Sequence, residues 1–244
     1  MKDNETKFGF QIINKKDKTK KVGEVFDSVT NNYDLMNNLM SFGLHKLWKK
    51  FVIESARLRT KAKILDIASG TADLTLSFSK LDKDFEIYQT DINYSMLAEG
   101  QEKITDQGKI IPGIVCDAEA IPFPNNYFDC VTIAFGLRNM TNINKASSEI
   151  YRVISPGGKV IILEFSHVHK PLKKIYDLFS FRVIPKLGKI FANDEKSYQY
   201  LVESIRVHPN QEELKKIMQK EKFENISYVN MNGGIVAIHK GYKI

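Results

Sequence analysis

The sequence predicts an α/β fold built on a mainly parallel sheet with helices on both faces. From Lys63 onward, short apolar runs alternate with stretches of helical periodicity, which is the pattern of successive strand–helix units. The apolar runs are nearly continuous, as expected for parallel strands that are buried on both faces. Near the end of the chain, two strand-like runs flank Asn232-Gly233-Gly234. That turn predicts a hairpin, so the last strand pair should be antiparallel.

The part of the chain that precedes the sheet is expected to be a tail followed by helices. Residues 1–21 are polar and rich in lysine. They lack the apolar segment of a secretory signal and are predicted to be a flexible tail. Residues 22–58 are predicted to be N-terminal helices, because apolar side chains recur there at helical spacing.

Residues 59–165 should contain the sheet and most of its helices. Strands are expected at 64–68, 85–90, 110–115, 130–135 and 160–165, and helices at about 72–80, 95–106 and 144–154. Residues 213–244 add a C-terminal helix and the hairpin, which makes seven strands in a single domain of 1–244. This is the Rossmann-like architecture of class I S-adenosylmethionine (SAM)-dependent methyltransferases. An ordinary dinucleotide dehydrogenase, the rival α/β enzyme, lacks the terminal hairpin.

A long insertion, residues 166–212, separates the fifth strand from the last helix. Long connections in compact domains are often functional lids, so a helical substrate lid is predicted here. Pro185 should break or kink its helix. An apolar stripe at helical spacing runs along Leu172, Ile175, Tyr176, Phe179 and Val183, with cations interspersed at Lys173, Lys174, Arg182, Lys186 and Lys189. A basic amphipathic segment fits a membrane surface; the alternative is an ordinary helix packed on its own domain.

The composition is that of a globular protein with an excess of positive charge. The chain has 244 residues and a formal net charge of +7, which favours an anionic partner unless the lysines only keep the surface solvated. It contains no apolar run of the about 18 residues that would cross a bilayer. Cys116 and Cys130 lie in apolar runs, as expected for free thiols in a reducing compartment. These features predict a cytoplasmic protein, with peripheral contact at the inner membrane face.

The turn after the first predicted sheet strand is the candidate cofactor loop. It runs Asp66-Ile67-Ala68-Ser69-Gly70-Thr71-Ala72, and its predicted contacts are Asp66, Gly70 and Thr71. Small residues let the backbone approach a ligand, and N–H groups at a helix N-terminus can bind a carboxylate. Alanines stand where the usual pattern has glycines, and the loop keeps its path if φ stays negative there. Thr71 either binds the cofactor or caps the helix.

Two further strand ends carry acidic side chains. Asp91 ends the second strand, about 20 residues after Gly70, where an acid can bind ribose hydroxyls. Asp117, followed by Ala118, ends the third strand and can accept a hydrogen bond from an adenine amino group. Capping of the next turn is an equally good role for Asp117.

Longer stretches carry a family resemblance. Residues 33–48, YDLMNNLMSFGLHKLW, closely resemble the N-terminal signature of the ubiquinone/menaquinone C-methyltransferase family, and residues 152–159 followed by 163–166 resemble its second signature. Residues 135–139, 192–194 and 233–243 also match. The resemblance extends over about residues 8 to 244. It implies that SAM donates a methyl group to a ring carbon of a polyprenylated benzoquinol, a demethylmenaquinol, or both. It also implies cofactor contacts at Thr71, Asp91, Asp117-Ala118 and Ala134, where the family commonly has serine.

Carbon methylation of a quinol needs a phenolate and a base. Phenols have a pKa near about 10, so the site must favour the ionised form. Arg138 is the candidate that stabilises the oxyanion, with Asn139 orienting the ring oxygen; the alternative is that Arg138 pairs with Glu164 to hold its loop. His45 and Tyr33 are the candidate bases, although a histidine in a helical segment is often a packing or capping residue.

Other cofactors and functions are less well supported by the residues. His167, His169 and Asp177 show no metal-ligand spacing, so no metal is predicted. A nucleic-acid methyltransferase would have an Asn/Asp-Pro-Pro-aromatic loop or a Pro-Cys nucleophile, and the corresponding positions lack both; no nucleic-acid partner is expected. A non-catalytic SAM-binding protein remains an alternative because of the alanine positions. A homo-oligomer or a complex of quinone-biosynthesis enzymes is compatible with the sequence.

Overall fold

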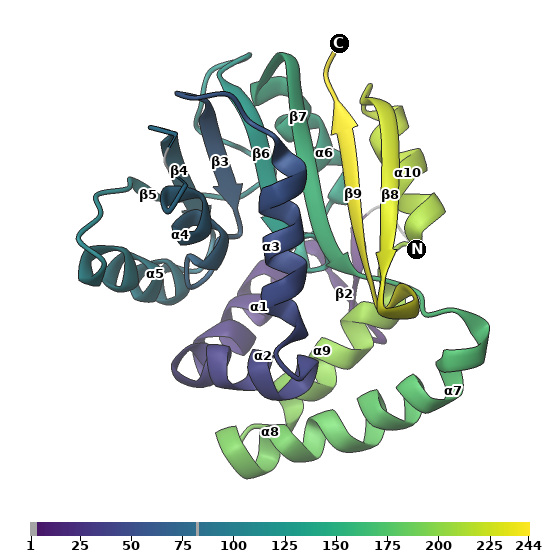
Figure 1. Cartoon of the computed structure of the whole chain (residues 1–244). Coiled ribbons are helices and arrows are strands. Elements are labelled where there is room, and N and C mark those ends of the chain that lie inside the picture. Colours follow the sequence, from purple (N-terminus) through teal and green to yellow (C-terminus); the bar gives the residue numbers. More distant parts are fainter. Residues whose placement is uncertain (1–3, 82) are drawn as a thin grey trace.

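The computed structural model describes residues 4–81 and 83–244. Its centre is a seven-stranded sheet in the order β5-β4-β3-β6-β7-β9-β8. The bounds of these strands are β3 Lys63–Ile67, β4 Glu86–Asp91, β5 Gly113–Val115, β6 Phe128–Ala134, β7 Ile154–Phe165, β8 Glu224–Met231 and β9 Val236–Tyr242. β3 to β7 pair in parallel, whereas β9 runs antiparallel to both β7 and β8. The predicted parallel sheet with an antiparallel terminal pair is confirmed (Figure 1).

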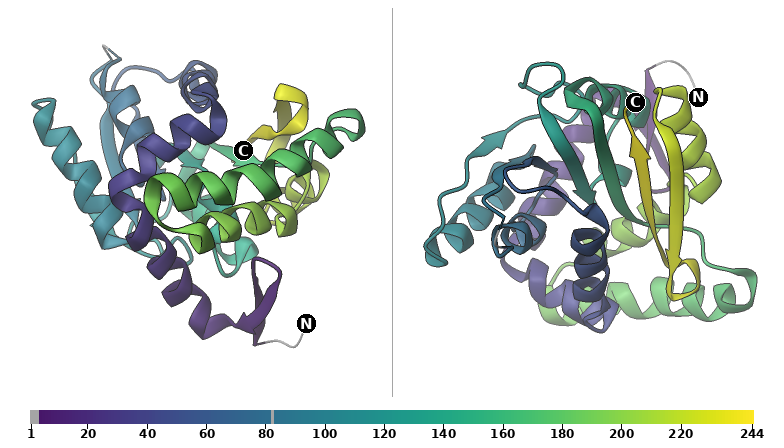
Figure 2. Two further views of the ribbon diagram at one scale, coloured as in Figure 1. Left: turned by 90° about the horizontal axis from the view of Figure 1, so that it is seen from below. Right: turned by 45° about the horizontal axis from the view of Figure 1, so that its top comes forward.

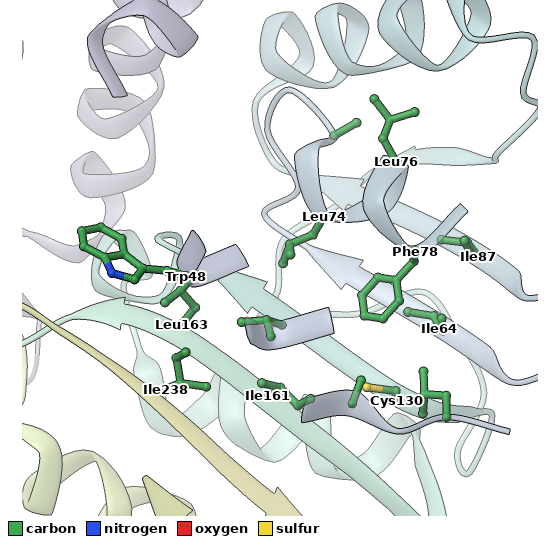
Figure 3. Close-up of a cluster of buried hydrophobic side chains, with 14 of the residues drawn as sticks. Trp48, Ile64, Leu74, Leu76, Phe78, Ile87, Cys130, Ile161, Leu163 and Ile238 are labelled. Carbon is green, nitrogen blue, oxygen red and sulfur yellow. The ribbon is translucent and has the colours of Figure 1, made fainter. Parts of the chain in front are cut away.

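Helices cover both faces of the sheet because successive strand residues point to opposite sides. Ile64 packs with the helices α3 and α4, whereas its neighbour Leu65 packs on the other face with α6 and α10. Figure 3 shows the buried cluster on the face of the sheet that carries α3 and α4, with Trp48 beside Leu163 and Phe78 beside Ile64. The helices of these layers are α3 Leu44–Ala56, α4 Asp73–Ser79, α5 Tyr94–Asp106, α6 Ile143–Val153 and α10 Gln211–Lys220.

Side-chain caps fix where several of these helices begin. Asn93 accepts a hydrogen bond from the backbone N–H of Met96, directly after β4. Asn210 and Glu213 form a reciprocal capping box at the start of α10. Because Asn93 ends the turn that follows Asp91, the cap holds the end of β4 and the start of α5 in a fixed relation.

The remaining helices gather at one edge of the sheet, beyond the carboxyl ends of the parallel strands (Figures 1 and 2). They are α1 Lys15–Val29, α2 Tyr33–Ser41, α7 Lys170–Leu178, α8 Ile184–Ala192 and α9 Glu195–Val207, with one-turn helices η1 Thr30–Asn32 and η2 Leu137–Asn139. A π-turn, η3 Phe179–Val183, joins α7 to α8, and η4 Asn232–Gly234 joins β8 to β9. The regular α-helix is interrupted just before Pro185, where a break or kink was expected: the π-turn ends at Val183, and Pro185 is the second residue of α8, where no N–H is needed.

The predicted flexible tail is wrong for most of its length. Residues 1–3 lie outside the described residues, but β1 Glu5–Phe8 and β2 Gln11–Asn14 form a hairpin and α1 follows at once. The hairpin packs on α9, since Phe8 stacks on Tyr200 with 4.2 Å between ring centroids. Glu203 accepts a hydrogen bond from the backbone N–H of Phe10. Tyr200 and Glu203 are almost 200 residues away in the sequence, so the pattern of residues 1–21 could not predict these contacts.

Candidate active site

A first cavity lies at the carboxyl edge of β3, β4 and β6. It encloses about 800 Å³ of space between atoms, part of it open to solvent. Among the residues around it are Thr19, Val22, Gly23 and Phe26 from α1, and Gly70, Asp91, Asp117, Ala118, Ala134 and Asn139 from the strand ends. Of these residues, Thr19 belongs to the segment predicted as a flexible tail, so that segment includes part of the wall of this cavity.

The candidate cofactor loop follows a left-handed path. φ is +51° at Ala68, +53° at Gly70 and +66° at Ala72, so the condition of negative φ at the alanines is not met. A left-handed alanine costs about 1–2 kcal/mol. The loop is held by a bond from the backbone N–H of Ser69 to the carbonyl of Thr90, 3.0 Å long. Tertiary hydrogen bonds thus impose a conformation that glycine would adopt freely.

Asp91 connects this loop to the next strand. One carboxylate oxygen accepts the backbone N–H of Gly70 at 2.9 Å, and the other accepts that of Asn93 at 2.9 Å. Burial raises the pKa of the Asp91 carboxyl above its usual value, opposed by these backbone donors. Asp91 is one of the residues that line the first cavity.

The other predicted cofactor residues divide into two groups. Asp117, Ala118 and Ala134 line the first cavity as expected, and Asp117 also caps its own turn by accepting the N–H of Glu119 at 2.9 Å. Asp117 therefore caps its turn and lies at the cavity, while its contact with adenine stays a prediction.

Asp66 and Thr71 do not line the first cavity. Asp66 is buried and accepts hydrogen bonds from the hydroxyls of Thr132 and Thr75, each at 2.8 Å. Thr71 donates its hydroxyl to Asp34 on α2 at 3.0 Å, so it neither caps α4 nor faces the cavity. In this structure the side chain of Asp66 joins β3 to β6 and α4, and the hydroxyl of Thr71 ties the loop to the N-terminal helices, so their contacts with a cofactor stay predictions.

A second cavity adjoins the first, and the two share the side chains of Phe26, Tyr33 and Phe135. It holds about 680 Å³ of space and is largely apolar. The polar side chains around it are Tyr33, Asn37, Ser41, His45, Arg138, Ser197, Tyr198 and Tyr200. Two molecules, one bound in each cavity, would therefore be adjacent to each other beside Tyr33.

Arg138 lies at the second cavity but is paired with Glu164. The guanidinium Nη1 and the backbone N–H of Arg138 donate to the two oxygens of Glu164, at 2.8 and 3.1 Å. Nη1 also donates to the carbonyl of Phe135, and Nε donates to Ser204. Both members of the pair are buried. The alternative role, holding the loop, is the one that the structure shows, and the charge of Arg138 is compensated.

Asn139, His45 and Tyr33 are all found at one of the two cavities. Asn139 lines the first and accepts the hydroxyl of Tyr200 at 3.1 Å. His45 lines the second, 2.8 Å from the hydroxyl of Ser41 through Nδ1. Burial and the neighbouring Lys49 lower the pKa of His45, so it is neutral at neutral pH. Burial raises the pKa of Tyr33, which disfavours it as a base.

Comparison with known proteins decides which family this site belongs to. The model of the ubiE/COQ5 methyltransferase family matches residues 14–243. The chain belongs to that family. It is 53% identical over 239 residues to the ubiquinone/menaquinone biosynthesis C-methyltransferase UbiE of Nitrosospira multiformis, and 54% identical over 239 residues to that of Burkholderia multivorans; each alignment covers 98% of both chains.

The fold of this ubiE/COQ5 family member also matches solved methyltransferases. A SAM-dependent methyltransferase from Aquifex aeolicus superposes with a TM-score of 0.62 at 15% identity, covering 86% of this chain and 98% of the other. At that identity the match shows the fold alone. The predicted class I methyltransferase fold, the family and SAM as its methyl donor are thereby confirmed.

Three aromatic residues that line the second cavity could not be identified from the sequence: Phe26, Tyr198 and Tyr200. Phe26 belongs to the apolar pattern that predicts the N-terminal helices of residues 22–58. Tyr198 and Tyr200 lie two residues apart on α9, and nothing in their spacing separates a cavity residue from a packed one. Among the described residues, no group of three His, Cys, Asp or Glu side chains is arranged to hold a metal ion.

Proposed function

We propose that this chain is a SAM-dependent C-methyltransferase that methylates the ring of a polyprenylated quinol in ubiquinone or menaquinone biosynthesis. The joined cavities carry the proposal, because they provide a cofactor site and an aromatic-lined acceptor site that meet at Tyr33. The substrate class is supported by relatives named ubiquinone/menaquinone biosynthesis C-methyltransferase, whose sequences align with this chain over nearly its whole length.

The residues around the first cavity fit SAM. A Cβ at Gly136 would stand 2.4 Å from that of Ala68, so only a glycine there leaves the loop and the end of β6 in contact at the cavity floor. Asp91 would accept ribose hydroxyls, Asp117 and Ala118 would contact the adenine, and the turn at Gly70 would hold the amino-acid end. Bound SAM supplies an activated methyl group, so the chain's part is to bind and align both reactants.

His45 is the group that accepts the proton of the quinol hydroxyl. A ring carbon becomes nucleophilic when the hydroxyl beside it ionises, and free phenols have a pKa of about 10. His45 is neutral, and Nδ1 is engaged by Ser41, which leaves Nε2 to take the proton. After methyl transfer the methylated carbon gives up its proton to water, which restores the aromatic ring, and His45 returns its proton to the ring oxygen to give the methylated quinol.

Arg138 stabilises the phenolate by a directed N–H rather than by an uncompensated charge. Its hydrogen bonds to described residues use Nε, Nη1 and the backbone N–H, and Nη2 is the donor that remains. Glu164 fixes the guanidinium at the second cavity in advance, which is how preorganised donors contribute to catalysis. Asn139, held by the hydroxyl of Tyr200, orients the ring at the junction of the two cavities.

A third cavity gives the isoprenoid tail a route to the surface. It shares Ser41, Trp48, Phe165 and Leu201 with the second cavity, and its other walls are almost entirely apolar: Phe42, Leu44, Tyr176, Phe179, Ile184, Ile205 and Ile235. Phe42, one of these wall residues, is 79% exposed. The route therefore leads from the ring site to the outer face of α7 and α8.

That outer face is suited to a membrane. Ile175 is 71% exposed and Ile190 is 73% exposed, and basic side chains lie among them at Lys173, Lys174, Arg182, Lys186 and Lys189. Apolar side chains with surrounding cations bind anionic lipid surfaces. Among the described residues, no helix combines the length and apolarity of a membrane span, so this contact is peripheral, with residues 166–212 as the lid through which the substrate enters.

The activity is tested with the purified protein and SAM that carries a labelled methyl group. Short-chain demethylmenaquinol and a 2-methoxy-6-prenyl-benzoquinol are supplied under reducing conditions, and the corresponding oxidised quinones serve as controls. We expect label in the lipid phase with one or both quinols and none with the quinones, which have no hydroxyl to ionise. No label with either quinol would refute the proposed function and leave a non-catalytic SAM-binding protein.

The membrane contact is tested by sedimentation with lipid vesicles. The wild type should sediment with phosphatidylglycerol vesicles more than with phosphatidylcholine vesicles. Ile175→Glu and Ile190→Glu should reduce that binding. Ile110→Glu is the matched control, since Ile110 is 99% exposed but lies before β5, away from α7 and α8. Equal binding of all three variants would contradict the assignment of this face.

A further inference from the structure

The hydroxyl of Tyr198 is a buried polar group without a partner. Tyr198 is 3% exposed, and its Oη makes no hydrogen bond to any described residue. Leaving a buried hydroxyl unpaired costs about 1–3 kcal/mol, so such groups are rare in native proteins and usually have a reason. The residue lies on α9 and forms part of the wall of the second cavity.

The packing around Tyr198 holds the ring in place. A Cβ at Gly188 on α8 would lie 2.1 Å from Cδ2 of Tyr198, so glycine is what allows the ring to lie against that helix. Val29 and Val202 also pack against it in the same buried cluster. The ring is therefore fixed, while its hydroxyl end is unpaired.

Nearby polar side chains of the second cavity already have partners. The hydroxyl of Tyr200 is bonded to Asn139, and that of Ser197 lies 3.0 Å from Ser28. The groups near the Tyr198 hydroxyl are Tyr33 and Asp194, and both raise its pKa in addition to the effect of burial. A tyrosine with a raised pKa keeps its proton, so it acts as a donor.

We propose that Tyr198 donates a hydrogen bond to a ring oxygen of the quinol in the second cavity and so positions and stabilises the phenolate. The inference rests on the proposed function, because it assigns a residue to the acceptor site of that reaction. Tyr198 and Arg138 would then supply two donors to the ring from α9 and from the end of β6. A hydrogen bond to a developing anion strengthens as its charge grows, so the effect belongs mainly to the transition state.

Tyr198→Phe separates this role from a structural one. The change removes only the unpaired hydroxyl, so we expect the melting temperature to stay the same or to rise by about 2–4 °C for each kcal/mol of relieved desolvation. We expect kcat for quinol methylation to fall about 10- to 100-fold, as for the loss of a hydrogen bond to a charged group. KM for the quinol and the affinity for SAM should change little.

Tyr151→Phe is the matched control for the loss of a tyrosine hydroxyl. Tyr151 packs against Phe223 on the face of the sheet that carries α6 and α10, far from the second cavity, and its variant should keep wild-type kcat. If Tyr198→Phe also keeps wild-type kcat, the proposal is overturned. If the wild type itself labels no quinol, the proposed function fails first, and the binding experiment below still tests the donor.

The second readout is the ionisation of a bound probe, which needs no turnover. A short-chain nitrophenol analogue of the ring absorbs differently as phenol and phenolate, so its pKa on the protein can be read by spectroscopy. Other groups that face it are Tyr33, His45 and Arg138. We expect Tyr198→Phe to raise the pKa of the bound probe by about one unit, a tenfold effect, and Tyr151→Phe to leave it unchanged. An unchanged pKa in both variants would refute the donor role.

Discussion

Removal of the negative charge of Glu164 should destabilise the fold strongly. The Glu164 side chain is 2% exposed and that of Arg138 is 4% exposed, so Glu164→Gln leaves a buried guanidinium without its counter-charge. The carboxylate accepts Nη1 of Arg138 at 2.8 Å, the N–H of Arg138 at 3.1 Å and the N–H of Phe165 at 2.9 Å. A glutamine keeps one acceptor oxygen and turns an NH₂ group toward a remaining donor.

The expected loss is about 3–5 kcal/mol in the free energy of unfolding, the typical effect of breaking a buried pair by removing one partner. It is measured by urea denaturation at neutral pH. Glu54→Gln is the control, because Glu54 pairs with Lys50 on the surface with side chains 63% and 72% exposed; it should cost less than about 1 kcal/mol. A double variant, Arg138→Met with Glu164→Leu, should recover most of the loss. If Glu164→Gln costs no more than Glu54→Gln, the buried pair does not hold the loop.

Three further changes test the first cavity and its loop. Burial raises the pKa of Asp66 to about 6, so the native state keeps a proton that the unfolded chain releases above about pH 4. The free energy of unfolding should therefore fall by about 3 kcal/mol as the pH rises between these two values. Thermal unfolding of Asp66→Asn should show a smaller loss of stability over the same pH range. Asp91→Ala should weaken SAM binding by about 1.5–3 kcal/mol in calorimetry, and an unaltered affinity would exclude Asp91 as a ribose ligand. Ala68→Gly should raise the free energy of unfolding by about 1 kcal/mol, because φ is +51° there; a decrease would show that packing of the methyl group outweighs the strain.

The sheet could be predicted because its strands carry their own signal. Residues such as Ile64, Leu65 and Val131 are apolar in continuous runs, and burial on both faces is the direct cause of that pattern. The hairpin at Asn232 followed from turn chemistry alone. The hairpin of residues 5–14 could not be predicted in this way, because its stability depends on contacts of Phe8 and Phe10 with α9.

The site was predictable where a residue's place in the fold fixes its role. Asp91 at the end of β4 and Asp117 after β5 reach the first cavity through topology. Thr71 and Asp66 occupy equally suggestive places, but partners distant in sequence, Asp34 and Thr132, take up their polar atoms. Tyr198 is recognisable only once the absence of a hydroxyl partner can be seen among the described residues.

The π-turn between α7 and α8 determines the direction in which the side chains of α8 point relative to those of α7. Each residue of an α-helix turns the chain by about 100°, and a π-turn accommodates one residue more than an α-turn. If the residues of η3 formed regular α-helical turns instead, α8 would be rotated relative to α7 by about that angle. The exposed Ile190 would then point in a different direction relative to Ile175, and the two side chains could not both contribute to the membrane contact proposed above.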